Sequence, residues 1–96
     1  MKVFLEILSG PADGTIFNFS KSVIMGRDKD CDIPLPLDNF LSRRHSQILV
    51  IEPECFLEDL KSTNGSFVNE ELLEKRVLLE NGQMFRIGKT YMRIKW

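Results

Sequence analysis

Short apolar segments that alternate with polar residues recur along the chain, and turn residues separate them. Val3, Leu5 and Ile7 share one parity near the N-terminus, and Met92 and Ile94 do so near the C-terminus. A period of two is that of a strand with one buried face, whereas an amphipathic helix repeats about every 3.6 residues. Glycine, asparagine and proline interrupt the segments at short intervals. The pattern predicts an all-β sandwich or barrel.

The composition limits what such a protein can do. A chain of 96 residues, 43% of them hydrophobic, supplies one modest core, so we expect a single domain over residues 1–96. A formal net charge of −1 argues against a surface that neutralises many nucleic-acid phosphates. No apolar run approaches the roughly 20 residues of a membrane-spanning helix, and no signal-peptide pattern opens the chain. We expect neither nucleic acid nor a membrane as a partner.

Cys31 and Cys55 are the only cysteines, and the chain has one histidine. So few cysteines without a secretory pattern indicate reduced thiols, and hence an intracellular, cytoplasmic setting. The spacing of these residues matches no metal site, so we expect neither a metal nor a cofactor. The sequence fits a free-standing protein as well as a module of a longer one, and it leaves the oligomeric state open.

Two segments allow more than one interpretation. From Asn69 to Leu79 the residues fit a capped short helix, with Glu71 and Lys75 one turn apart, as well as they fit short strands. Asn64-Gly65 lies between two strand-like segments and is a strong hairpin signal. The same pair could also belong to a binding loop.

Three polar segments each follow a strand-like segment: Gly26-Arg27, Ser42 to His45, and Ser62 to Asn69. The loops of a sandwich cluster at its two ends, so three loops can meet at one end. Guanidinium and hydroxyl donors match the tetrahedral oxygens of a phosphate, because charge-assisted hydrogen bonds to them are strong. A carboxamide matches a peptide backbone, because it offers both donors and an acceptor.

The ordered series of these segments resembles the motifs of forkhead-associated domains, which bind phosphothreonine peptides. Gly26-Arg27, Ser-Arg-x-His at 42–45, and Asp-x-x-Ser-x-Asn-Gly-x-x-Val-Asn at 59–69 occur in the family's order and rough spacing. Each motif is weak alone, but the ordered set is specific and covers nearly the whole chain. The resemblance implies a sandwich of two antiparallel sheets with the binding loops clustered at one end. It also implies short strands and a loop, rather than a helix, at 70–79.

The resemblance assigns ligand-binding roles position by position. Arg27 and Ser42 would bind the phosphate, with Arg43 beside them. Thr63 would approach the phosphothreonine, and Asn64 would hold the ligand backbone next to it.

Other positions match residues that support the site in the family. Gly26 would allow a close backbone approach, His45 would make a hydrogen bond between loops, and Gly65 would form a turn. Asn69 would close the strand after that turn. Phe40 replaces a basic residue that certain members have, so an apolar preference downstream of the phosphothreonine is expected rather than an acidic one.

The resemblance implies a non-catalytic module for phosphorylation-dependent protein–protein interaction in signalling. Its partner would be a protein that a Ser/Thr kinase has phosphorylated on threonine. One alternative is an interaction module that ignores phosphate. A second is a small hydrolase with Ser42 as nucleophile and His45 as base, although the chain has no Gly-x-Ser-x-Gly segment.

Overall fold

The alternating segments form strands throughout, and the computed structural model, which describes all 96 residues, contains no helix. Strands dominate because β-branched and aromatic residues are frequent in the segments between the turns. The strands are β1 (Val3–Ile7), β2 (Ile16–Phe19), β3 (Val23–Gly26), β4 (Ile33–Pro34), β5 (Ser46–Ile51), β6 (Glu54–Asp59), β7 (Ser66–Val68), β8 (Glu71–Leu72), β9 (Val77–Leu79), β10 (Met84–Ile87) and β11 (Thr90–Lys95).

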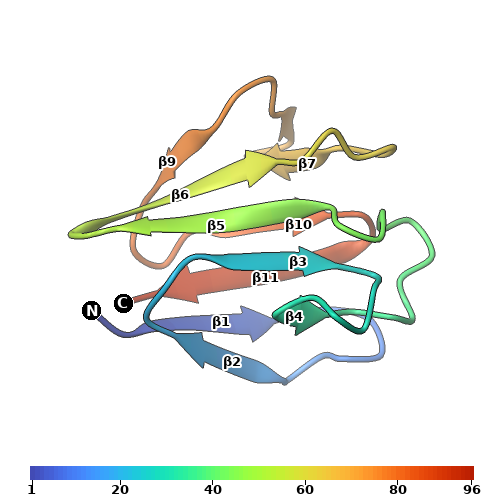
Figure 1. Cartoon of the computed structure of the whole chain (residues 1–96), viewed down its shortest axis with the longest axis horizontal. Coiled ribbons are helices and arrows are strands. Elements are labelled where there is room, and N and C mark those ends of the chain that lie inside the picture. Colours follow the sequence, from blue (N-terminus) through green and yellow to red (C-terminus); the bar gives the residue numbers. More distant parts are fainter.

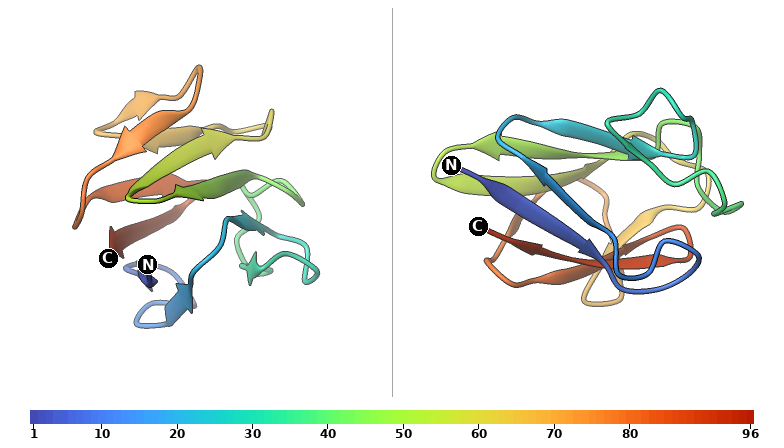
Figure 2. Two further views of the ribbon diagram at one scale, coloured as in Figure 1. Left: turned by 60° about the vertical axis from the view of Figure 1, so that its left-hand side comes forward. Right: turned by 90° about the horizontal axis from the view of Figure 1, so that it is seen from below.

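The strands form two sheets packed face to face, which confirms the predicted sandwich (Figures 1 and 2). One sheet has six strands in the order β2-β1-β11-β10-β7-β8, and the other has five in the order β4-β3-β5-β6-β9. Neighbouring strands are antiparallel except β3 and β4, which are parallel. The parallel pair is short because β4 contains only two residues, and Leu35 then donates from its backbone N–H to Gly26 O at 2.8 Å.

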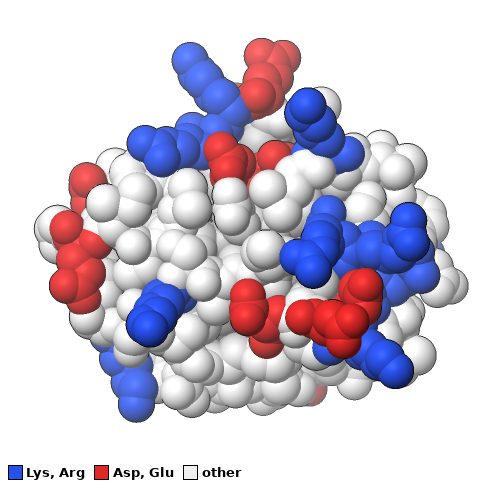
Figure 3. Space-filling view, viewed as in Figure 1, with Lys and Arg blue, Asp and Glu red and all other residues white.

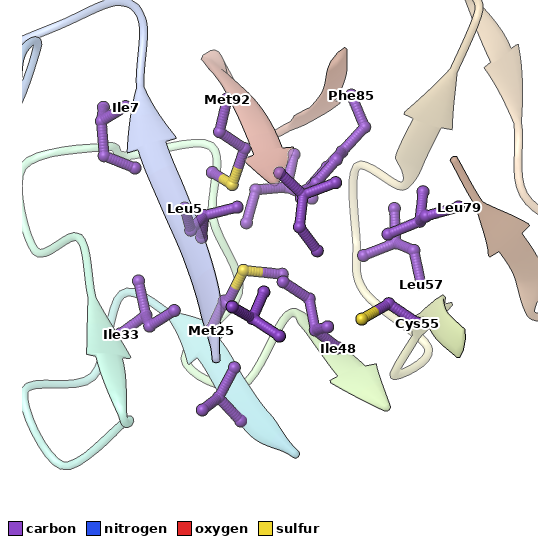
Figure 4. Packing of buried hydrophobic residues seen from close by; sticks show 14 of the residues in the cluster. Leu5, Ile7, Met25, Ile33, Ile48, Cys55, Leu57, Leu79, Phe85 and Met92 are labelled. Atoms are coloured by element: carbon purple, nitrogen blue, oxygen red, sulfur yellow. The ribbon is translucent and has the colours of Figure 1, made fainter. Parts of the chain in front are cut away.

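The inward-facing residues of both sheets make one core (Figure 4). Each sheet contributes every second residue of its strands, the ones that face inward, as the alternation predicted. Leu5 and Met92 come from the six-stranded sheet, Met25 and Ile48 come from the five-stranded sheet, and all four are fully buried. The core therefore holds the two layers in a fixed relation, and this relation fixes the loops that leave them.

The two ambiguous segments adopt strands and turns. Asn64-Gly65 is not a hairpin turn, because β6 belongs to the five-stranded sheet and β7 to the six-stranded sheet. The hairpin signal is local and carries no information about which sheet the next strand joins. The segment from 69 to 79 contains β8 and β9 instead of a helix. Asn69 and Glu70, with φ of 52° and 66°, form the tight turn between β7 and β8.

The two ends of the sandwich differ. The connections β3–β4, β4–β5, β6–β7 and β10–β11 lie at one end, on the right in Figure 1. The N- and C-termini lie side by side at the other end in all three views. No helix of the chain could span a membrane.

Candidate functional site

The three polar segments identified in the sequence meet at the end of the sandwich opposite the termini (Figure 1). Arg27 directly follows β3, and Ser42 lies in the β4–β5 connection. Thr63 and Asn64 lie in the β6–β7 connection, which crosses from one sheet to the other. The sandwich topology thus brings together residues that are far apart in the chain.

Gly26 lets two of these segments run in direct contact. A Cβ atom at this position would collide with the carbonyl oxygen of Arg43. The backbone N–H of Arg27 donates to Ser42 O at 3.0 Å, and that of Asp28 donates to Arg43 O at 3.1 Å. A side chain at position 26 would therefore separate the β3 end from the Ser42 loop.

His45 joins the other pair of loops from a fully buried position. Its Nδ1 accepts a hydrogen bond from the backbone N–H of Ser42 at 3.0 Å. Its Nε2 therefore carries the proton and donates to Gly65 O at 2.7 Å. The imidazole contacts the backbone of Ser42 and not its hydroxyl, so it is not placed as the base of a serine nucleophile.

Three contacts between side chain and backbone connect the ligand-binding residues implied by the resemblance. The Nε of Arg27 donates to Leu41 O at 3.1 Å. Ser42 Oγ accepts from the backbone N–H of Thr63 at 3.0 Å, and Asn64 Nδ2 donates to Phe40 O at 2.8 Å.

These contacts leave specific atoms available to a ligand. The terminal guanidinium nitrogens of Arg27 and the hydroxyl proton of Ser42 make no hydrogen bond within the chain. The Oδ1 of Asn64 likewise makes none. The donors suit an anion, and the amide oxygen suits a peptide N–H.

An open hollow of about 380 Å³ adjoins Ser42 and is lined also by Asp28, Arg43 and Arg44. Arg43 and Arg44 are exposed, so their guanidinium groups can move toward a ligand. Lys and Arg side chains gather at this end of the molecule, beside a group of Asp and Glu side chains (Figure 3). The hollow is polar and shallow, which suits a charged group on an extended chain better than an enclosed small molecule.

Gly65 and Asn69 occupy positions that require unusual backbone geometry. Gly65 has a φ of +87°, and a Cβ there would also collide with the side chain of Leu72. Asn69 has a φ of 52°, which asparagine tolerates better than most residues. Both residues shape the backbone, and the structure records no side-chain hydrogen bond for Asn69.

Asp59 shapes the β6–β7 loop, a role that its place in the 59–69 motif does not reveal. Its Oδ1 accepts from the hydroxyls of Ser62 and Ser66, both at 2.6 Å, and its Oδ2 accepts from the backbone N–H of Ser62 at 2.8 Å. Burial by itself raises the pKa of this carboxyl. The three hydrogen bonds and the nearby His45 outweigh burial and hold the pKa of Asp59 below its usual range.

Asp38 fixes the loop that carries Ser42, and it too was missed. Its buried carboxylate accepts from Thr90 Oγ1 at 2.6 Å, Lys89 N at 2.9 Å and Phe40 N at 2.9 Å. The Lys89 ammonium also lies 4.2 Å from the centre of the Phe40 ring. The aspartate itself was the only sequence signal, because its partners Lys89 and Thr90 lie 51 and 52 positions further along the chain, at the β10–β11 turn.

Comparison with known proteins agrees with this fold and loop arrangement. The FHA domain family matches residues 23–88. FhaB of Mycobacterium tuberculosis is 30% identical over 93 residues, which are 96% of this chain and 59% of FhaB. This chain therefore spans about three fifths of that relative's length.

Two solved structures resemble the whole chain. One, from a structural and functional study of phosphothreonine-dependent FHA domain interactions, is 31% identical with a TM-score of 0.87, and the match covers 100% of this chain and 97% of the other. The FHA domain of the CT664 protein from Chlamydia trachomatis is 28% identical with a TM-score of 0.91, over 100% and 98% of the two chains. The chain belongs to the forkhead-associated domain family.

Proposed function

We propose that this chain binds phosphothreonine-containing segments of partner proteins through the loops at the end opposite its termini. The observation that carries the proposal is the set of hydrogen bonds that ties Arg27, Ser42 and Asn64 together and leaves donors and an acceptor free. The phosphothreonine-dependent interactions studied for a structure 31% identical to this chain support it. Arg27 and Ser42 bind the phosphate with Arg43 nearby, Thr63 faces the phosphothreonine, and Asn64 holds the adjacent peptide backbone.

Titration of one peptide in phosphothreonine, phosphoserine and unmodified forms tests this function. A hydrogen bond to a charged group contributes about 1.5–3 kcal/mol, so Arg27→Ala or Ser42→Ala should weaken phosphopeptide binding about 10- to 100-fold. Arg76→Ala, in the exposed loop between β8 and β9, is the control and should bind as the parent does. Equal binding of phosphorylated and unmodified peptides would instead indicate an interaction module that ignores phosphate.

Discrimination between threonine and serine depends on one methyl group. Burial of one such carbon contributes about 0.8 kcal/mol, so we expect phosphothreonine to bind about fourfold more tightly than phosphoserine. A larger ratio would mean that the loops also select the rotamer of the phosphorylated side chain.

The preference for residues that flank the phosphothreonine involves two elements. Phe40 alone favours an apolar residue, but Lys89 places an ammonium over its ring. We infer that the peptide position downstream of the phosphothreonine accepts an apolar side chain and tolerates an acidic one. Lys89→Ala should therefore weaken peptides with an acidic residue downstream more than peptides with an apolar residue there.

The proposal extends to the setting of the chain. We infer a non-catalytic, cytoplasmic module whose residues 1–96 form one domain, a view supported by the pairing of β1 with β11. Its partners are proteins marked by a Ser/Thr kinase, rather than nucleic acid or a membrane.

Burial raises the pKa of the Cys31 and Cys55 thiols, which favours their neutral form. Turnover of an activated ester that disappears in Ser42→Ala would contradict the non-catalytic part.

A further inference from the structure

The outer face of the six-stranded sheet, on the side away from the core, carries an unusual set of side chains. The cross-strand register places Glu6, Arg93 and Met84 in one row. It places Arg86 between Tyr91 and Phe67 in the next row. We call this surface the outer face; its residues are Phe4, Glu6, Ile16, Asn18, Phe67, Leu72, Met84, Arg86, Tyr91, Arg93 and Lys95.

Exposed apolar side chains are concentrated on the outer face. The chain has nine large hydrophobic residues that are exposed, and five of them lie here. They are Phe4, Ile16, Leu72, Met84 and Tyr91, with exposed fractions from 37% to 58%. Apolar side chains that are grouped on one exposed face mark interaction sites more often than isolated exposed residues do.

A hollow of about 110 Å³ lies within the outer face, beside Arg86. The Arg86 guanidinium lies 4.0 Å from the centre of the Phe67 ring and 6.0 Å from that of Tyr91, and it donates to Gly88 O at 2.6 Å. Met84 also lines the hollow. These contacts hold aromatic walls in place before any partner arrives, and a fixed pocket with aromatic residues and an arginine is typical of interface hot spots.

The charge of the outer face is opposite in sign to that of the whole chain. Arg86, Arg93 and Lys95 outnumber Glu6, whereas the chain has a net charge of −1. None of the three cations is in a salt bridge, whereas the Met1 amino group pairs with Glu52.

The cations are also unevenly distributed. Glu70 lies at the rim of the hollow on the β7–β8 turn. Glu6 lies opposite Arg93 in the strand register, so the cation with no acidic residue opposite it is Lys95 on β11.

We propose that the outer face docks an acidic protein segment that also carries apolar side chains. An apolar side chain of this partner fills the hollow beside Arg86, and its carboxylates lie over Arg93 and Lys95. The loops with Arg27, Ser42 and Asn64, proposed above to bind the phosphothreonine, are called the phosphothreonine loops. They lie at one end of the sandwich, whereas the outer face lies on a flat side, so both can be occupied together.

A second copy of the chain fits the outer face less well. A two-fold contact would oppose its cations to themselves, and a contact with the other sheet would build an open chain of copies. Stacked aromatic and arginine side chains also suit single-stranded nucleic acid. The exposed Ile16, Leu72 and Met84 favour a protein, because aliphatic side chains offer nothing to phosphates.

Amide chemical-shift mapping of the 96-residue chain tests the proposal. The probe is a pool of short peptides in which Asp or Glu alternates with Leu, Ile or Phe, added with the phosphothreonine loops saturated by phosphopeptide. We expect shifts on β7, β10 and β11, and binding that weakens as salt is raised. Two comparison pools, with Lys for the acidic residues or Ser for the apolar residues, should bind at least about tenfold more weakly.

Variants separate this surface from the rest of the molecule. Arg93→Glu should weaken the acidic pool about tenfold or more and leave phosphopeptide binding unchanged. Met84→Ser should weaken it as well, whereas Leu78→Ser, a similarly exposed residue on the other sheet, should not.

Several outcomes would overturn the proposal without touching the proposed function. These are equal binding of the Lys pool, shifts confined to the phosphothreonine loops, or tighter binding of oligothymidine than of the acidic pool. A molecular mass that rises with protein concentration in the parent, and does not rise in Arg93→Glu, would assign the outer face to a second copy instead. Loss of phosphate dependence in the separate phosphopeptide titration would overturn the proposed function and leave this surface standing.

Discussion

A few polar residues beneath the loops decide whether the site keeps its shape. Asp59 holds Ser62 and Ser66 through its carboxylate, and His45 connects Ser42 with Gly65. None of these contacts uses the Arg27, Ser42 or Asn64 atoms that remain free for a ligand. They fix backbone groups of loops that would otherwise be free to move.

The first prediction concerns acid stability through Asp59. Its pKa is lowered in the folded state, so its contribution to stability is present above the unfolded pKa of about 3.9 and is lost as the pH falls through the lower folded value. Asp59→Asn should therefore lower the free energy of unfolding at neutral pH, and the difference from the parent should shrink below about pH 4. Urea unfolding across this pH range measures it. The exposed Glu54→Gln is the control, and curves for Asp59→Asn and the parent that stay parallel down to pH 2 would contradict the prediction.

The second prediction concerns Ser46, which is fully buried and whose Oγ has no hydrogen-bond partner. Removing an unsatisfied buried hydroxyl should raise the free energy of unfolding, so Ser46→Ala should stabilise the chain by about 1 kcal/mol. Ser66→Ala is the matched variant, because its hydroxyl donates to Asp59, and it should destabilise by a similar amount. Urea denaturation of both variants decides the matter, and a loss of stability in Ser46→Ala would show that the hydroxyl has a partner in solution.

At the scale of elements, the turn between β7 and β8 forces two residues into the left-handed region. Both Asn69 and Glu70 have positive φ, as a type I′ turn requires, and Asn-Gly is the favoured pair for such a turn. Glu70→Gly should thus stabilise the chain by about 1 kcal/mol in thermal unfolding. Gly82→Ala, at a φ of +91° with open space around it, should shift stability in the opposite direction. A destabilised Glu70→Gly would mean that the glutamate side chain has an interaction that outweighs the strain.

The β4–β5 loop depends on the β10–β11 turn. Asp38→Ala removes the acceptor that holds the Phe40 and Lys89 backbones and Thr90, so the loop should lose its fixed shape. We expect Asp38→Ala to bind a phosphopeptide about tenfold more weakly than the parent does. The affinity of Asp38→Asn should lie between the two, because its amide oxygen keeps one contact. Fluorescence titration measures this. Unchanged affinity in a folded Asp38→Ala protein would show that the loop holds itself.

The alternation predicted most strands of the fold, because burial of one sheet face leaves a period of two in the sequence. It does not predict which sheet each strand joins, and so the sequence leaves Asn64-Gly65 open between a hairpin turn and a binding loop. The motifs predict which residues form the candidate site. They do not predict the contact of Asp38 with Lys89, because it joins residues 51 positions apart and leaves no local pattern.

At the scale of the whole molecule, the binding loops and the chain ends occupy opposite ends of the sandwich (Figure 1). Fusion of a folded protein to either terminus should therefore leave the dissociation constant for a phosphopeptide unchanged. Insertion of a flexible Gly-Ser segment between Asn81 and Gly82 should also be tolerated, since both residues are exposed. The same insertion after Asp38 should abolish binding, because it lies between the Asp38 anchor and Ser42 and breaks the hydrogen bond from Phe40 N to the Asp38 carboxylate. Equal effects of the two insertions, measured by titration, would contradict this division.

The pairing of β1 with β11 has a mechanical consequence. Phe4 lies opposite Lys95, so the first and last strands are hydrogen-bonded neighbours whose free ends leave at the same corner. Tension applied to the two ends would break the backbone hydrogen bonds of this pair one after another, starting at the termini, instead of all at once. If the chain lies within a longer polypeptide under tension, β1 and β11 would separate first at this corner. The loops at the opposite end would be the last to be strained.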